Sequence, residues 1–141
     1  MVKKIQLIAL VLLTPVLLFA TSKGRGQETA PAVSEGLAHA LAASTLTAAA
    51  QRLPGMRFDR EKAPHPEGFY WFEVTANVPD EASPLLGYFA VNKMTGDVWD
   101  PVQCMKLASA TIRRFQGQLR QKGKISAAEF HRIAGEAPCH P

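Results

Sequence analysis

The N-terminal segment places the strongest constraint on the fold, because it decides which residues remain to build it. Two lysines precede a predominantly apolar core at residues 5–19, and small polar residues follow it. A basic start, a short apolar core and a small-residue exit are the three parts of a secretory signal peptide. The core is also shorter than the roughly 20 residues that span a bilayer. We therefore predict a signal peptide over residues 1–22, with cleavage after Ser22 or alternatively after Ala20. An uncut N-terminal anchor is the rival interpretation.

The remaining chain has the size of one domain. Removal of the signal peptide leaves about 119 of the 141 residues. Residues 23–33 lack hydrophobic periodicity, so we predict a flexible leader there. We predict a single α+β domain over residues 34–141. The expected compartment is the periplasm or the cell exterior, after cleavage near Ser22.

Charge is distributed unevenly along the chain. Residues 28–100 hold 10 acidic and 5 basic side chains, whereas residues 101–141 hold 7 basic and 2 acidic ones. Such a division indicates either a basic binding face or two layers of one fold that attract each other. The modest net charge of +4, together with export, argues against nucleic acid as a partner.

The first half of the predicted domain indicates one helix followed by an antiparallel sheet. Ser34 is a suitable N-cap, and the alanine-rich residues 36–53 predict a helix that ends before Pro54. Alternating apolar residues predict strands, and a Thr-Gly turn predicts a hairpin with Gly96 in a left-handed conformation. The expected strands are residues 56–59, 69–78, 86–92 and 97–99.

The second half predicts two helices. Asp100 is a suitable N-cap with Pro101 at the first helical position, and apolar residues then recur at spacings of three and four. This helix is expected to end at Gly123. A capping box that begins at Ser126 predicts a shorter helix over residues 127–134. The expected fold is therefore α+β, with an N-terminal helix packed on a three- or four-stranded antiparallel sheet and a C-terminal helix hairpin after it.

The two cysteines, Cys104 and Cys139, predict one disulfide in an oxidising compartment. Cys104 lies in the first turn of the predicted long helix, whose remaining length is about 27 Å. A short helix that folds back and an extended tail together recover about 25 Å, so Cys139 can return to Cys104. Two weaker alternatives are a metal site formed by both cysteines with His140, which lacks a ligand-spacing signature, and a free nucleophilic Cys104.

Aromatic residues are the candidates for partner binding. No known catalytic or nucleotide-binding motif is present. His39 is expected at the surface or packed, and His65 in an exposed loop. If Phe69, Trp71 and Trp99 lie on a sheet face that no helix covers, they form a patch suited to a protein or ligand partner. The alternative is that the C-terminal helix hairpin covers this face and buries them.

One segment resembles a known family. Residues 87–99, with the sequence GYFAVNKMTGDVW, resemble the hairpin of PepSY-type and cystatin-like exported domains, in which an aromatic-x-Val strand turns through Thr-Gly into the next strand. The preceding helix and strand follow the same order. The resemblance implies a non-catalytic binding or inhibitory module and transfers no catalytic residue. Envelope immunity proteins that neutralise toxins are similar in their compact helix-on-sheet design.

These observations favour a small exported binding protein, either an inhibitor or an immunity-type protein, with no cofactor and no metal. Its partner would be another envelope or secreted protein. A small envelope hydrolase or isomerase is the alternative, and it would need a sheet-lined pocket that holds a perturbed carboxylate or histidine. A structural envelope component held by an uncut N-terminus is the third interpretation.

Overall fold

The computed structural model of the chain describes residues 30–78, 84–123 and 125–139. The predicted signal peptide lies outside these residues, and so does most of the predicted leader. The end of that leader belongs to the packed structure, because Val33 is fully buried in the core and its amide donates to the carbonyl of Lys93. Within the described ranges, no helix is long and apolar enough to cross a membrane.

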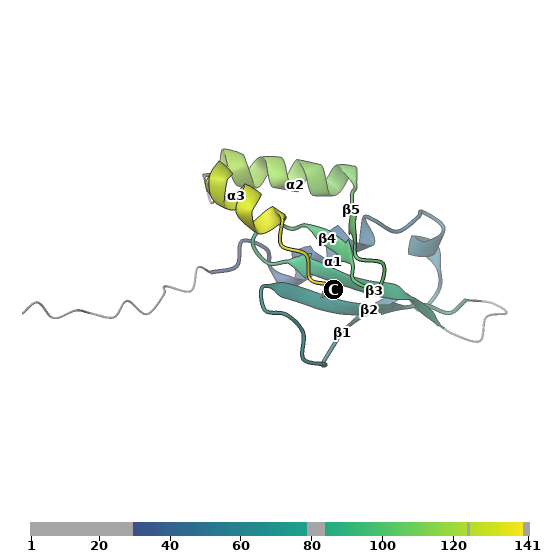
Figure 1. Cartoon of the computed structure of the whole chain (residues 1–141). Helices are drawn as coiled ribbons and strands as arrows, with labels where there is room; N and C mark the ends of the chain where they lie inside the picture. Colours follow the sequence, from purple (N-terminus) through teal and green to yellow (C-terminus); the bar gives the residue numbers. More distant parts are fainter. Residues whose placement is uncertain (1–29, 79–83, 124, 140–141) are drawn as a thin grey trace, which may run out of the picture.

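The centre of the fold is an antiparallel sheet whose strands follow one another in chain order (Figure 1). The α+β class is as predicted, but the sheet has five strands rather than three or four. Its strands are β1 (Arg57–Arg60), β2 (Phe69–Thr75), β3 (Leu85–Asn92), β4 (Val98–Asp100) and β5 (Met105–Leu107).

The hairpin between β3 and β4 forms as the sequence predicted. Asn92 accepts backbone hydrogen bonds from Met94 and Thr95 through its side-chain oxygen, at 2.8 and 3.0 Å. Gly96 has a φ of 69°, the left-handed conformation that this turn requires. A side chain at Gly96 would also collide with Phe115, since an added Cβ would lie 2.6 Å from its ring. Glycine is therefore needed at this turn for two reasons, its left-handed backbone conformation and the close packing of the Phe115 ring.

The first helix, α1 (Glu35–Ala43), lies behind the sheet in Figure 1. Ser34 caps it as predicted, by accepting from the amide of Leu37. The prediction that it reaches residue 53 is wrong, because the hydroxyls of Ser44 and Thr45 donate to carbonyls of the last turn at 2.6 and 2.7 Å. Such local bonds compete with helix propagation. A short 3-10 helix, η1 (Ala50–Arg52), follows.

The predicted helix start at Asp100 is also wrong, and a strand replaces the first turns of that helix. The side chain of Asp100 accepts from the amides of Val102 and Gln103, as an N-cap would, but the chain makes a tight turn instead. Cys104 then adopts a φ of 51°, which a right-handed helix cannot contain. Met105, expected in the apolar stripe of the helix, instead pairs with Asp100 at the β5 edge and is 49% exposed.

Two helices complete the chain. The second, α2 (Ala110–Gln121), is capped by Ser109, whose hydroxyl also lies 2.7 Å from that of Ser44 at the end of α1. The third, α3 (Ala127–Ala134), is capped by Ser126 and ends at Gly135, as predicted. The predicted helix hairpin therefore exists, but its first arm begins nine residues later than expected.

The main core lies between the sheet and the first two helices. Buried side chains of α1 meet one face of the sheet, and Ile112 of α2 joins them. A smaller cluster holds α3 through Ile125, Phe130 and Ile133, with Met94 of the hairpin against it. The buried members of the main core are Val33, Ala38, Leu41, Ala42, Phe72, Val74, Phe89, Val91, Val98 and Ile112.

Candidate functional site

The sheet face opposite the main core brings the two tryptophans together. The register pairs Trp71 with Ala90, Ala90 with Trp99, and Trp99 with Lys106. These four residues form one row across β2, β3, β4 and β5, and side chains paired in register point to the same face. The small Ala90 between the two indoles is fully buried. Both tryptophans are half-buried.

The three aromatic candidates differ in their surroundings. Phe69 is only 8% exposed, so it supports the face from within rather than forming its surface. Trp71 stacks flat on His65, with ring centroids 4.1 Å apart and an interplanar angle of 10°. The amine of Lys106 lies over the ring of Trp99, 5.8 Å from its centroid. His65 was expected as an exposed loop residue, and it is instead half-buried against Trp71.

The helix hairpin does not meet the tryptophans in the way the alternative interpretation expected. Its apolar residue Ile112 joins the core on the α1 side, and α3 forms its own cluster around Phe130. The face is crossed instead by the segment after α3, which runs down in front of the sheet in Figure 1. Whether Phe69, Trp71 and Trp99 bind a partner stays a prediction.

This face also carries polar atoms that the described part of the chain leaves unpaired. The indole nitrogens of Trp71 and Trp99 are enclosed without a hydrogen-bond partner there, and so are Nε2 of His65 and Oγ1 of Thr75. An enclosed donor without a hydrogen-bond partner lowers the stability of a fold by about 1–3 kcal/mol, so such groups are uncommon in folded proteins. Four of them on one side of one sheet distinguish this face from the rest of the molecule.

A hollow of about 210 Å³ opens beside Trp71. The loop between β1 and β2 forms one wall of it, with His65 stacked on the indole, and Lys93 forms part of another. Glu61 and Glu67 bring two carboxylates to its rim. A histidine and acidic groups therefore share a concave surface here.

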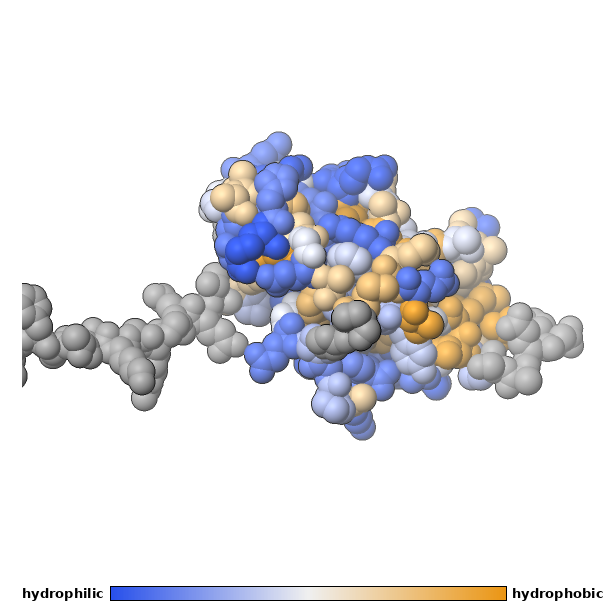
Figure 2. All heavy atoms as spheres, in the orientation of Figure 1, coloured by the Kyte–Doolittle hydropathy of each residue, from blue (hydrophilic) through white to orange (hydrophobic). Residues whose placement is uncertain are grey.

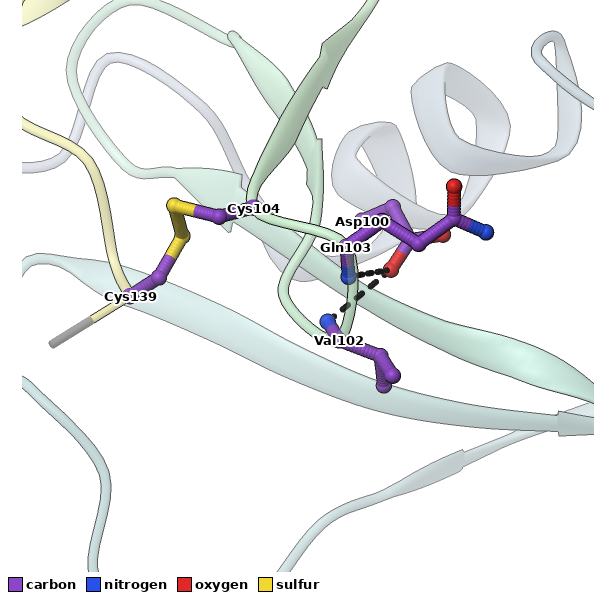
Figure 3. Close-up of a disulfide and its surroundings, with 5 residues drawn as sticks. All are labelled: Asp100, Val102, Gln103, Cys104 and Cys139. Carbon is purple, nitrogen blue, oxygen red and sulfur yellow. Dashed lines mark hydrogen bonds between the residues drawn. A yellow bond between two sulfur atoms is a disulfide. The ribbon is translucent and has the colours of Figure 1, made fainter. Parts of the chain in front are cut away.

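The turn between β4 and β5 presents a second exposed surface. The backbone amides of Val102 and Gln103 donate to Asp100 at 2.9 and 3.0 Å, and Cys104 closes the turn (Figure 3). Val102 is 74% exposed at this turn. It borders a hollow of about 320 Å³ that is lined mainly by the start of β3. Figure 2 shows hydrophobic surface gathered at this end of the sheet.

A disulfide joins Cys104 to Cys139, with the two Cα atoms 5.7 Å apart (Figure 3). It fastens the segment after α3 to the β4–β5 turn, not to a helix as the sequence suggested. Because both sulfurs are bonded to each other, neither the free nucleophile nor the metal site with His140 applies to this state. His140 itself lies outside the described residues. Within the described ranges, no group of three or more metal-ligating side chains is present.

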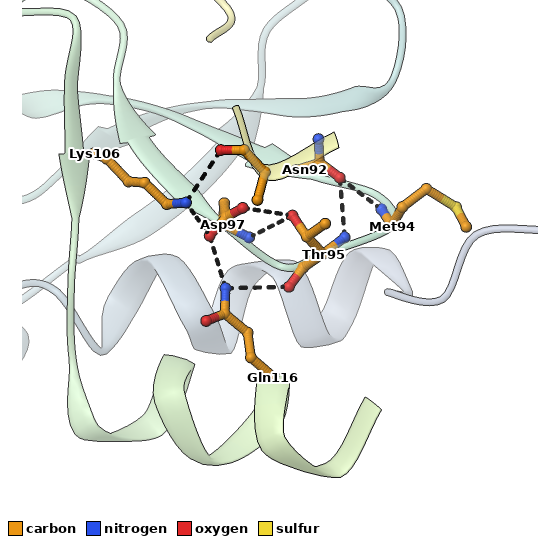
Figure 4. Close-up of polar contacts among 7 residues, drawn as sticks. Asn92, Met94, Thr95, Asp97, Lys106 and Gln116 are labelled. Carbon is orange, nitrogen blue, oxygen red and sulfur yellow. Dashed lines mark hydrogen bonds and ion pairs between the residues drawn. The ribbon is translucent and has the colours of Figure 1, made fainter. Parts of the chain in front are cut away.

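Asp97 is the centre of a buried polar network between the hairpin and the helices (Figure 4). Its carboxylate accepts from Thr95 Oγ1, Gln116 Nε2 and Lys106 Nζ, each at 2.7 Å. Lys106 also donates to the carbonyl of Ala134 at 3.3 Å. Every partner of this carboxylate is part of the fold, so we assign the network to structure rather than to chemistry.

The acidic groups of α3 are similarly engaged. Arg132 donates to Glu129 and to Glu136 along the outer side of the helix. The hydrogen bond from Arg132 holds the pKa of Glu129 below its ordinary value, and the same contact raises the pKa of Arg132. His39 was expected either at the surface or packed in the fold, and it is packed between the rings of Phe58 and Phe72.

Comparison with known proteins gives one structural relative. No protein-family profile matches the chain, and no curated protein sequence matches it significantly. The chain is similar to one chain of a solved structure described as a type VI secretion system effector-immunity complex from Pseudomonas protegens. The two are 26% identical with a TM-score of 0.56, and the match covers 72% of this chain and 86% of that chain. The resemblance to PepSY-type and cystatin-like domains stays a prediction.

Two features of the candidate surface were missed at the sequence level. Val102 was placed inside a helix, because Asp100 and Pro101 satisfy the rules for a helix start as well as those for a turn. His65 gave no signal of its own, since only the tertiary structure brings its loop onto Trp71. The tryptophans themselves were identifiable from their alternation along the strands.

Proposed function

We propose that this chain is an immunity-type binding protein of the cell envelope, which binds a secreted toxic protein and blocks it by covering part of its surface. The observation that carries the proposal is the structural match over most of both chains to a chain of an effector-immunity complex. The identity of 26% is low, so we carry over the type of role and not a particular partner.

Three properties of the chain support this role. The leader predicts export, and the Cys104–Cys139 disulfide is a bond that persists in oxidising compartments. The half-buried tryptophans are of a type enriched at the centres of protein interfaces, and Val102 adds an exposed aliphatic side chain at a second place on the surface. Both places lie on strands or on a turn that is fixed by the disulfide, so little flexibility is lost when a partner binds.

The candidate contact surface is the tryptophan row together with the β4–β5 turn. Trp71 and Trp99 each have a partly exposed ring, which offers an apolar surface to a partner. Val102 offers an exposed aliphatic tip. Lys106 lies over Trp99 at the end of the row, with its amine paired to Asp97.

The test begins with affinity capture of partners from an envelope extract by the full chain with a C-terminal tag. We expect one captured protein whose expression stops growth of a sensitive cell, and whose toxicity disappears when this chain is co-expressed. Trp71→Ala, Trp99→Ala and Val102→Asp should each lower its affinity, by about 30-fold where the residue is a hot spot. Ala48→Asp, on an exposed segment near η1, is the matched control.

Two outcomes contradict the proposal. The first is a captured protein that is harmless when expressed alone, which would remove the immunity role. The second is equal capture by all the variants and the control, which would remove the proposed contact surface.

A second candidate function is favoured by the hollow beside Trp71. A small envelope hydrolase or isomerase would use His65 and a carboxylate of Glu61 or Glu67 in that hollow. This alternative predicts that His65→Ala abolishes an activity without weakening capture of any protein. The immunity role predicts the reverse, namely that His65→Ala weakens capture of the partner protein before it affects any activity.

A further inference from the structure

The exposed sides of α2 and its C-cap carry four basic residues that we call the basic face, and one of them, Arg120, also lies over the ring of Phe130: Arg113, Arg114, Arg120 and Lys122. We infer that the basic face docks an acidic surface of the partner protein. This inference rests on the proposed function and adds to it the chemistry of the partner.

Among the described residues, no acidic side chain forms an ion pair with the basic face. All four of its side chains are exposed, and none of them takes part in an ion pair within the described ranges. Residues 101–123 contain no Asp or Glu at all. The two oppositely charged halves of the sequence meet in one described ion pair only, between Lys106 and Asp97. Attraction between layers of the fold therefore does not account for the excess of positive charge on α2.

Arg120 in the last turn of α2 suits the partial negative charge at that end of the helix, but the position of Arg113 and Arg114 does not help folding. The amino end of a helix carries a partial positive charge, and acidic residues are the ones that stabilise it. The first turn of α2 contains no acidic residue, and Arg113 and Arg114 follow directly after it. Arginines placed there oppose the helix dipole. Residues that break a local rule without a structural gain are most often functional.

Gly117 provides an independent indication at the centre of the same helix. Glycine weakens a helix interior relative to alanine, so it needs a reason to be there. Packing within the chain supplies none, because a Cβ at this position would meet no atom within 4 Å. Gly117 lies one turn from Arg113 and shares its side of the helix. Bare backbone between the arginines allows the surface of a partner to approach closely.

The chemistry of the face favours a protein over the other anionic partners. Membrane-surface helices need an apolar side to insert, and the apolar residues Ile112 and Leu119 of α2 are buried in the fold. Three of the four basic residues are arginines, whose planar guanidinium groups bind carboxylates through paired hydrogen bonds. The visible upper edge of the molecule, where α2 lies, is largely hydrophilic in Figure 2, as the rim of a protein interface is.

Site-directed photo-crosslinking in cells that make the full chain tests this inference. A benzoylphenylalanine introduced at Gln121, which is exposed one turn beyond Gly117, should crosslink to a protein in a segment rich in Asp and Glu. The same group at Ala48 should not. The double variant Arg113→Glu with Arg114→Glu should lower the adduct at least about fivefold. Arg52→Glu with Lys62→Glu changes the net charge equally at other exposed sites and should leave the adduct unchanged.

A second variant separates docking from loss of structure. Gly117→Leu places a side chain in open space, so the melting temperature should not fall, while the adduct from position 121 should decrease at least about fivefold. The charge-reversed double variant should also keep its melting temperature, because glutamates suit the amino end of a helix.

Several results would overturn the inference. The first is that position 121 gives no more adduct than position 48. The second is an adduct to lipid or to a protein segment without acidic residues. The third is an adduct that survives both the charge reversal and Gly117→Leu. A third crosslinking position at Gln103, beside Val102, distinguishes failure of the basic-face inference from failure of the proposed function. Crosslinks to a protein from position 103 alone would remove the basic face and keep the proposed function. The absence of crosslinks from both positions would remove both.

Discussion

At the scale of single residues, Asp97 connects the β3–β4 hairpin with β5 and α2 through one carboxylate. It is 2% exposed, and its three partners satisfy it at 2.7 Å each. Removing a buried carboxylate that other buried groups depend on leaves those groups unsatisfied. The network is therefore expected to contribute more stability than any of the exposed ion pairs, which are worth about 0–1 kcal/mol each.

We expect Asp97→Ala to lower the free energy of unfolding by about 2–3 kcal/mol, because Thr95 and Gln116 then lose their acceptor. Chemical denaturation followed by tryptophan fluorescence measures this. Asp59→Ala breaks the exposed pair with Arg57 and is the control, with an expected change of under about 1 kcal/mol. Equal effects of the two substitutions would show that the network is not a structural centre.

Gly117 within α2 and Gly96 packed against that helix should respond to alanine substitution in opposite directions. Gly117→Ala is expected to raise the free energy of unfolding by up to about 1 kcal/mol, since it removes a weak point in a helix and meets nothing. Gly96→Ala is expected to lower it, because the φ of 69° is strained for alanine and the Cβ would collide with Phe115. Thermal unfolding of both variants tests the pair. A loss of stability in Gly117→Ala would mean that this glycine has a structural role.

At the scale of elements, the turn at Asp100 shows where local sequence signals stop being decisive. An aspartate that accepts amides two and three residues later begins a helix in one context and a tight turn in another. Here the following residues pair with β4, and Leu107 adds to the main core beside Val98. The gain from that pairing and burial depends on the whole sheet, so no window of a few residues contains it.

The disulfide is the other feature at this scale, because it fastens the end of the chain to the β4–β5 turn. It closes a loop with a sequence separation of 35 residues, which is worth about 3–4 kcal/mol in the chain-entropy model. We expect Cys104→Ser with Cys139→Ser to lower the free energy of unfolding by about that amount. Denaturant unfolding of the oxidised protein, of the double variant and of the reduced protein measures it.

The reduced protein is the internal control for that experiment, because it keeps both sulfurs and lacks only the bond. It should match the double variant in stability. A double variant as stable as the oxidised protein would mean that the loop is held closed by the rest of the fold.

At the scale of the whole molecule, the structure divides into parts of unequal stability. The sheet, α1 and α2 share the main core, whereas α3 is held by the separate cluster of Ile125, Phe130 and Ile133. Its other described attachments include the guanidinium of Arg120 over the ring of Phe130, the bond from Lys106 to Ala134 and the disulfide just after it. Regions with few buried apolar contacts open locally without unfolding the rest.

We therefore expect backbone amides of α3 to exchange with solvent at least about tenfold faster than those of β2 and β3. Hydrogen exchange followed by NMR or mass spectrometry measures this, and reduction of the disulfide should widen the difference. Equal protection of α3 and the central strands would show that the molecule unfolds as one unit.

The features that the sequence alone determined are those in which a residue acts on its near neighbours. The caps at Ser34 and Ser126, the glycine turn at Gly96 and the alternation along β2 all depend on contacts a few residues apart, and the structure contains each of them. Tertiary structure alone decided that a fifth strand replaces the first turns of a helix. It also decided that two tryptophans meet across Ala90 and that the arginines of α2 form no ion pair with the described residues. Those outcomes depend on pairing and burial between segments far apart in the chain, whose free energy is defined only once the whole fold exists.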